Sequence, residues 1–397
     1  MTWSLERTID YERHNADVAA LWSAYHAGCP PRVPVSVTGS IRNYVQNPAL
    51  NEEHYTFEDF FTDPEVQIHC QLRYQRWCRH HLLCDTEMGP PKDGWTLAVD
   101  FQNSYDAAWF GCPLVFRDDA VPDTEEILKE DKGRLFDLSC PDPLRDGLMG
   151  RAVEFYEYMH DRCRDLEFDG LPVLPPTTIP GECCDGPLQA AYKLRGAAGL
   201  CMDMMEDPAY FHELMEFVTN ALVHRMKAVW HWRAQRQPEC VEEDGVKRPD
   251  FGLADDAIVL LSLEQYEEFV FPYHRRMVNI FSDGGPISMH LCGDAGRFFP
   301  FLRDNLDVDS FDTGFPIDLG AVRRELGPDV EIRGGPDVMT LRDGPEEIVR
   351  ERVRAACESG VMEGGRFIMI AANNLAPCTP VEHVAAMYDA AETYGRY

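Results

Sequence analysis

The sequence predicts one (β/α)₈ barrel that spans residues 1–397, with a helical and hairpin excursion within residues 1–100. Three observations favour this fold class. From about residue 257 onward, five apolar runs are each followed by a helical pattern, and such alternation is typical of parallel strands with right-handed crossovers. Barrels of this kind also use chains of about this length. Finally, polar residues stand where each apolar run ends, and the strand ends of a parallel barrel share one face.

The composition predicts a globular protein, because 45% of the residues are hydrophobic and 11% are aromatic. Asp and Glu total 68 against 37 Lys and Arg, which gives a formal charge of -31 and disfavours nucleic acid as a partner. No apolar run approaches the roughly eighteen residues of a membrane span, and the N-terminus lacks a signal-peptide pattern. The 14 scattered cysteines suit a reducing compartment. We therefore expect a cytoplasmic protein that does not enter a membrane.

The N-terminal part begins with a predicted helix over Tyr11–His26, in which apolar residues recur at helical spacing. The alternating run Arg32–Gly39 predicts a strand, which opens into a loop that holds Arg42 and Asn43. Both side chains could face a ligand there, and Arg42 could equally form a surface ion pair. A helical pattern over 56–84 and an extended run over 95–101 complete this part.

The middle of the chain predicts further alternation. Its expected elements are a short helix over 105–111, a strand over 113–116, an acidic helix from Asp123, a helix over 150–168, a strand over 171–174 and a helix over 188–194. The clearest helix begins at Asp207-Pro208, because Asp can cap a helix and Pro fits its first turn.

The C-terminal part predicts five strands, over 257–261, 287–290, 308–311, 330–333 and 366–371. Two of the intervening helices begin with capping boxes, formed by Ser262 with Gln265 and by Thr379 with Glu382.

Polar residues mark the ends of these strands. Asp255 and Asp256 flank the first, His290 and Cys292 end the second, Asp312 follows the third, and Asn373 follows the last. Side chains alternate along a strand, so the His290 imidazole and the Cys292 thiol, two residues apart, can converge on one metal ion. Zinc accepts this mixture of nitrogen and sulfur. A core histidine beside an inert buried thiol is the alternative interpretation.

Several stretches carry a family resemblance in their order and spacing. They are Phe110–Phe116, Gly186–Ala191, Asp255–Tyr273, His290–Gly293, Gly334–Asp337 and Leu375–Val384. From about residue 100 to its end the chain resembles the uroporphyrinogen decarboxylase superfamily of (β/α)₈ barrels. Its His290-x-Cys292-Gly pattern is similar to that of the zinc-dependent cobamide methyltransferases and, more distantly, to that of cobalamin-independent methionine synthase.

The resemblance implies a zinc site. In those relatives zinc is held by this histidine and cysteine, by a carboxylate at the next strand end, where Asp312 stands, and by a cysteine at the last strand. Asn373 occupies that last position here, where decarboxylases carry a histidine. Cys378 could supply a displaced thiolate, or it could be an ordinary thiol. We therefore expect His290 and Cys292 to bind zinc together with Asp312 or Cys378.

The resemblance also implies a function: a homodimeric methyltransferase that moves a methyl group between a small donor or acceptor and a corrinoid on a partner protein. Because zinc with fewer thiolates carries more positive charge, we favour demethylation of a substrate onto the corrinoid. The alternative enzyme is a metal-free decarboxylase, in which Asp255 or Asp256 stabilises a cationic pyrrole-like intermediate. The arginine-rich loop of true uroporphyrinogen decarboxylases is missing, since only Arg42 stands there. A non-catalytic protein that binds a corrinoid or tetrapyrrole is also open, because Asn373 replaces the usual functional residue.

Overall fold

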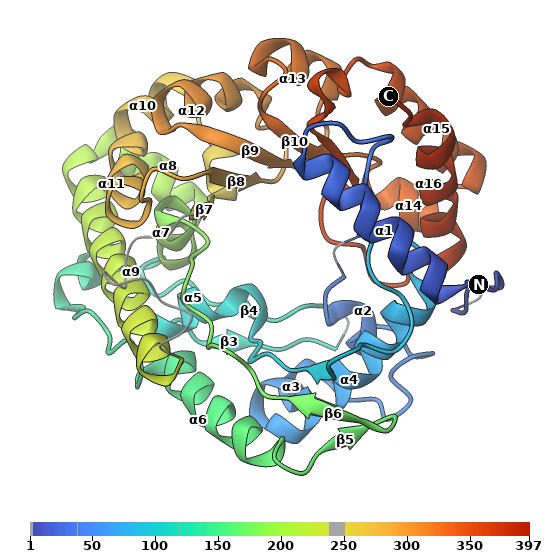
Figure 1. Ribbon diagram of the computed structural model, residues 1–397. Helices are drawn as coiled ribbons and strands as arrows, with labels where there is room; N and C mark the ends of the chain where they lie inside the picture. The colour runs from blue at the N-terminus through green and yellow to red at the C-terminus, as the bar shows by residue number, and fades with distance from the viewer. Residues whose placement is uncertain (1–2, 38, 119, 238–250) are drawn as a thin grey trace.

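The computed structural model describes residues 3–37, 39–118, 120–237 and 251–397. Figure 1 shows the helices following one another around a ring, with a six-stranded sheet along one side of its inner face. All strands of this sheet run parallel, in the order β1-β11-β10-β9-β8-β7. They are β1 Val35–Ser36, β7 Phe251–Ala254, β8 Ile287–Leu291, β9 Val308–Thr313, β10 Glu331–Gly334 and β11 Phe367–Ile370.

Two further parallel strands, β2 Trp95–Thr96 and β6 Leu171–Leu174, pair with each other. Together with the six-stranded sheet they give the (β/α)₈ barrel that the sequence predicts. Antiparallel pairs join β3 Leu114–Val115 to β4 Asp123–Thr124, and β5 Glu167–Phe168 to β6. These hairpins fall later in the chain than the predicted excursion within residues 1–100.

The helices surround the strands. They are α1 Tyr11–His26, α2 Arg42–Val45, α3 Phe57–Thr62, α4 Pro64–His81, α5 Tyr105–Trp109, α6 Gly147–Arg162, α7 Pro187–Arg195, α8 Ala197–Glu206, α9 Pro208–Arg236, α10 Leu263–Phe269, α11 Phe271–Phe281, α12 Phe299–Leu306, α13 Leu319–Leu326, α14 Val338–Asp343, α15 Glu346–Glu358 and α16 Val381–Tyr394. Short 3₁₀ helices are η1 Gln102–Ser104, η2 Lys132–Asp137, η4 Asp256–Leu260, η5 Gly296–Phe298 and η6 Glu363–Gly365. Within the described ranges, none of these helices is both long and apolar enough to cross a membrane.

Local sequence signals explain several of these boundaries. The Asp207 side chain accepts a hydrogen bond from the backbone of Tyr210, and Pro208 stands in the first turn of α9, as predicted. Helix α10 begins with the predicted capping box of Ser262 and Gln265. The predicted helix Tyr11–His26 and strand 171–174 are confirmed with the same boundaries.

The first of the five predicted C-terminal strands is wrong. Residues Asp256–Leu260 form η4, and the strand is β7, Phe251–Ala254, which lies just before them. The prediction was wrong because the apolar residues of this run lie in a short 3₁₀ helix and not in a strand. Within η4, Ile258 is fully buried while Leu260 is half exposed. Along β7, by contrast, the buried side chains of Phe251 and Leu253 alternate with partly exposed residues, as expected of a strand. The other four strands are confirmed in place.

Two other local predictions are also wrong. No acidic helix begins at Asp123, which instead lies in β4 and accepts a hydrogen bond from Lys193 Nζ at 2.9 Å. The capping box at Thr379 does not form, because α16 begins at Val381. The Thr379 hydroxyl donates to the carbonyl of Ala376 at 2.8 Å, so it stabilises the preceding turn instead.

Candidate metal centre

Three side chains from adjacent strand ends converge at one point of the barrel. Asp256 opens η4 directly after β7, His290 lies in β8, and Cys292 follows that strand. Each offers one ligand atom, a carboxylate oxygen, an imidazole nitrogen or a sulfur, and all three atoms lie within 4.8 Å of one another. His290 Nε2 is 3.2 Å from Cys292 Sγ, as the alternation of side chains along a strand predicts. This group of side chains is the metal cluster.

The His290 ring is oriented by the neighbouring strand. His290 and Asp312 are partners in the parallel register of β8 and β9, and Asp312 Oδ2 lies 3.2 Å from His290 Nδ1. Burial lowers the pKa of His290, but its hydrogen bonds with Asp312 and Cys292 outweigh this effect and raise the pKa to about 11. With Nδ1 bound to a carboxylate, Nε2 is the nitrogen that faces the cluster.

Two groups hold the Cys292 residue. Asn373 Nδ2 donates to Cys292 Sγ at 3.0 Å, so the side chain after β11 reaches the cluster. The backbone N–H of Cys292 donates to Asp256 Oδ1 at 2.7 Å, which ties the end of β8 to the end of β7. The Asn373 and Asp256 side chains therefore hold Cys292 in place at the cluster.

The cluster lies in a cavity of about 440 Å³. Its wall includes three carboxylates, from Asp123, Asp185 and Asp256, and three cations, from Arg42, Arg117 and Lys193. Lys193 is paired with Asp123, whereas among the described residues the Arg42 side chain donates to the neutral amide of Gln102, at 2.8 Å from Nε to Oε1. This cavity is the metal pocket.

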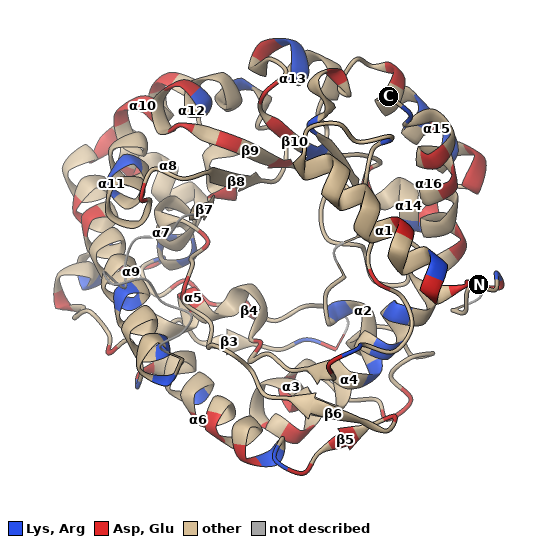
Figure 2. Cartoon of the chain, in the orientation of Figure 1, with Lys and Arg blue, Asp and Glu red and all other residues tan. Residues whose placement is uncertain are grey.

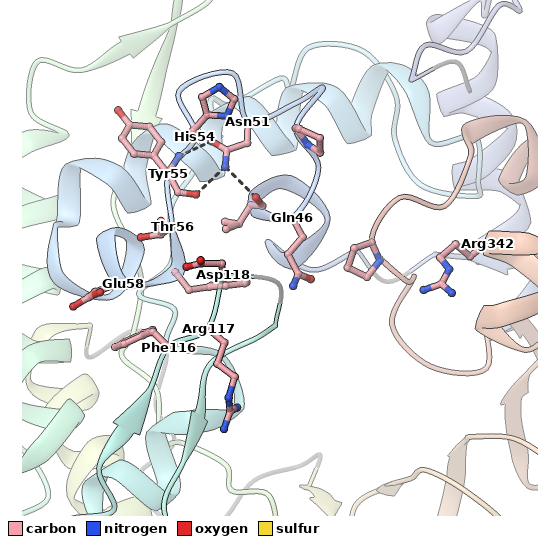
Figure 3. Close-up of a pocket in the computed structure, with 14 residues that line it drawn as sticks. Gln46, Asn51, His54, Tyr55, Thr56, Glu58, Phe116, Arg117, Asp118 and Arg342 are labelled. Carbon is pink, nitrogen blue, oxygen red and sulfur yellow. Dashed lines mark hydrogen bonds between the residues drawn. The ribbon is translucent and has the colours of Figure 1, made fainter.

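A larger cavity of about 710 Å³ lies beside it, between the loop that holds His54 and Tyr55, the segment Phe116–Asp118 and Arg342 (Figure 3). No residue of the metal cluster lines this larger cavity. We therefore place the candidate reaction site in the metal pocket, although it is the smaller of the two. Arg117 lines both cavities, and its side chain therefore lies where they adjoin. Figure 2 shows that acidic residues are otherwise spread over helices all around the ring, with cations between them.

Comparison with known proteins places this barrel in a family. The sequence profile of the uroporphyrinogen decarboxylase (URO-D) family matches residues 104–394. The chain belongs to the URO-D family.

Relatives within the URO-D family differ in their activities. The chain is 27% identical over 266 residues to a methylated-thiol--coenzyme M methyltransferase of Methanosarcina mazei, an alignment that covers 66% of this chain and 63% of the relative. It is also 29% identical over 133 residues to a uroporphyrinogen decarboxylase of Thermosynechococcus vestitus, which covers 32% of this chain and 37% of that protein. A solved structure, a methyltransferase from Methanosarcina mazei, shares the fold with a TM-score of 0.61 at 15% identity, over 95% of this chain and 98% of that one.

On this URO-D barrel the predicted ligands divide into two groups. His290 and Cys292 meet, whereas Asp312 contacts the far nitrogen of His290 and Cys378 lies outside the cluster. The Cys378 thiol is 3.7 Å from the carbonyl oxygen of Gln46, because the turn after Asn373 directs it away. Asp256, predicted as a catalytic residue, is the third member of the metal cluster.

Three other predicted site residues have distinct surroundings. Asp255 is fully buried and accepts hydrogen bonds from the backbone of Leu188 and Gln189 at 2.9 and 2.8 Å, so it anchors the first turn of α7. Asn43 is buried 3.4 Å from the carbonyl of Ala376 and does not line the metal pocket, whereas Arg42 does.

Asp185 is a pocket residue that the sequence analysis missed. It lies in the loop before α7 and lines the metal pocket beside Asp256. Burial, followed by the Asp106 and Asp256 carboxylates, raises the pKa of Asp185 to about 7. In the sequence, Asp185 stands directly before Gly186-Pro187, a stretch that carries the family resemblance. This position indicates that a helix starts nearby, but it does not indicate that the Asp185 side chain lines the metal pocket.

Proposed function

We propose that this URO-D family protein is a zinc-dependent methyltransferase that moves a methyl group between a small substrate and a corrinoid carried by a partner protein. The observation that carries the proposal is the convergence of Asp256, His290 and Cys292 within 4.8 Å of one another. The similarity to a methylated-thiol--coenzyme M methyltransferase supports the same reaction class. Because the chain spans 63% of that relative's length, its activity does not transfer by similarity alone.

The donor set fits zinc better than a hard cation. Sulfur, nitrogen and oxygen ligands together are typical of zinc, whereas magnesium and calcium prefer oxygen alone. Asp312 on the far nitrogen of His290 gives the carboxylate–histidine arrangement that orients a zinc ligand. Three protein ligands leave a fourth position open, the pattern of a catalytic zinc.

Each residue of the site then has a separate task. Bound zinc would supply a Lewis acid that polarises the atom carrying the methyl group, or keeps a substrate thiol deprotonated. Asp312 holds His290 in the orientation that presents Nε2. Asn373 donates to the Cys292 sulfur and holds it at the cluster. With one thiolate and one carboxylate as ligands, bound zinc would keep more positive charge than in a site with more thiolates. This would favour polarisation of a donor, and hence demethylation of the substrate onto the corrinoid.

The experiment that tests the zinc site compares two cysteine variants. Purified protein should contain about one zinc per chain, Cys292→Ser should lose most of it, and Cys378→Ser should keep it because that thiol lies outside the cluster. Activity is measured as methyl-cobalt absorbance after mixing with a reduced corrinoid protein and methyl ethers, amines or thioethers. Unchanged zinc in Cys292→Ser would show that the metal binds elsewhere.

Decarboxylation of a tetrapyrrole is the second candidate, because several relatives are uroporphyrinogen decarboxylases. That reaction needs no metal. Release of carbon dioxide from a porphyrinogen by metal-free protein, without methyl transfer to any corrinoid, would favour it over the methyltransferase.

A further inference from the structure

Helix α4 binds a strand edge through a row of glutamines. Gln71 Nε2 donates to the carbonyl of Ala98 at 2.7 Å, and Gln71 Oε1 accepts from the N–H of the same residue at 2.9 Å. The side-chain amide thus makes the pair of bonds that a neighbouring strand would make. Four helical residues rise about 6 Å and two extended residues about 6.8 Å, so glutamines four apart can follow alternate strand residues.

Gln67 and Gln75 continue this pattern on either side. Gln67 binds both backbone groups of Asp100, at 2.6 Å to its oxygen and 3.2 Å from its nitrogen, and Gln75 donates to the carbonyl of Thr96 at 2.6 Å. On its other edge β2 pairs with β6. The extended segment is therefore bound by β6 at residues 95–97 and by the α4 glutamines up to Asp100, which fixes the position of Asp100.

Asp100 in turn fixes Gln102 in an unusual conformation. Asp100 Oδ1 accepts from the backbone N–H of Gln102 at 2.7 Å, and Asp100 Oδ2 accepts from Gln102 Nε2 at 2.6 Å. Gln102 has a φ of 50°, in the left-handed region that residues other than glycine seldom adopt. Such conformations persist when the surrounding contacts impose them, and they gather at functional sites. Because the backbone N–H and the side-chain Nε2 of Gln102 both donate to Asp100, the direction of its Oε1 is fixed.

Gln102 Oε1 contacts Arg42, a residue that lines the metal pocket. It accepts from Arg42 Nε at 2.8 Å and from the Ser40 hydroxyl at 3.1 Å. Arg42 lines the metal pocket together with Asp256, His290 and Cys292. Within the described ranges, no carboxylate lies at ion-pair distance from Arg42, although the charges of Asp100 and Asp185 act on it from further away. Among the described residues its guanidinium donates through Nε, to Gln102, which leaves the two terminal nitrogens to donate to a ligand.

We propose that Gln102 is a positioning residue that orients Arg42 to bind an anionic group of the small substrate in the metal pocket. The proposal rests on the proposed function in that this substrate is the methyl donor or acceptor. A carboxylate, phosphate or sulfonate accepts two parallel hydrogen bonds from a guanidinium. Without Gln102 the long Arg42 side chain would keep its charge but lose its fixed direction. Gln102 therefore raises the affinity for anionic substrates over neutral ones, and it does not contribute to substrate binding in general.

The test compares two thiol probes of the same length, 3-mercaptopropionate and 1-propanethiol, by calorimetric titration of the zinc-loaded protein. Wild-type protein should bind the carboxylate probe at least about tenfold more tightly, the size of a charge-assisted hydrogen bond. Gln102→Ala should remove most of this preference while leaving the affinity for propanethiol unchanged. Arg42→Gln should do the same, and the double variant should lose nothing further, because both residues act through one contact.

Two control variants separate selectivity from folding. Gln75→Ala removes one glutamine at the exposed end of the row and leaves the Arg42 contact intact, so it should keep the preference. Gln102→Gly accommodates the positive φ but lacks the amide, so it should lose the preference without the backbone cost of alanine. A full preference in Gln102→Ala, or an equal loss for both probes, overturns the proposal.

A third titration distinguishes this result from failure of the zinc function. Metal-free protein is titrated with propionate and with propanol, which have no thiol. If the zinc proposal is wrong, the affinity for the thiol probes will be the same with and without metal. The wild-type protein will nevertheless bind propionate more tightly than propanol, and Gln102→Ala will bind the two alike. If propionate and propanol bind wild type alike, Arg42 is no anion site and the Gln102 proposal fails by itself.

Discussion

Removing the Asp312 carboxylate should weaken zinc binding, because it holds the imidazole that presents Nε2 to the metal. The 3.2 Å contact between Asp312 Oδ2 and His290 Nδ1 is the protein contact that fixes the orientation of this ring. Partners of this kind contribute about tenfold to a hundredfold in metal affinity, or about 1.4 to 2.8 kcal/mol. Asp312→Asn keeps an oxygen that can accept from Nδ1, so the lower value is expected. Asp312→Ala leaves the ring without a partner, so the upper value is expected.

The assay is competition for zinc with a chromophoric chelator, followed by absorbance. Asp309→Asn is the matched control, since Asp309 lies in the same strand and accepts from the backbone of Ile287, away from the imidazole. Zinc affinity in the control should equal that of wild type. If Asp312→Ala binds zinc as tightly as wild type does, His290 is not held in this way and the assignment of the metal ligands is wrong.

Three other substitutions test separate parts of the site. Asp255→Ala removes the buried acceptor of the first turn of α7 and should cost about 3–5 kcal/mol in urea unfolding, whereas the exposed Asp17→Ala should change stability by under about 0.5 kcal/mol. Gly186→Ala places a Cβ 2.2 Å from a backbone oxygen at a φ of +96°, so it should lower unfolding free energy by more than about 1 kcal/mol. Asn373→Cys puts a second thiol where an amide now lies 3.0 Å from Cys292 Sγ, and chelator competition should show tighter zinc binding.

The sequence predicted the pair His290 and Cys292 because the alternation of side chains along a strand is a local property. It also grouped Asp256 with the polar residues at the strand ends, but as a catalytic residue, because the family resemblance assigned the carboxylate ligand to Asp312. The position of the first strand could not be read correctly from its apolar run. Because β7 ends at Ala254, Asp256 follows that strand and meets the other two residues.

The direction of Cys378 and the role of Gln102 could not be read from the sequence for a related reason. Five residues separate Asn373 from Cys378, and only the path of the turn decides which of them reaches the cluster. The positive φ of Gln102 is imposed by Asp100, which is itself held by α4. Such contacts depend on tertiary packing, which overrides local preference.

X-ray absorption at the zinc edge of the purified protein tests the proposed site most directly. The proposal predicts about one zinc per chain with a single sulfur near 2.3 Å, from Cys292, and nitrogen or oxygen ligands near 2.0–2.2 Å. In Cys292→Ser the sulfur shell should disappear. Protein without zinc, or zinc surrounded by two or more sulfurs, would contradict a centre built from Asp256, His290 and Cys292.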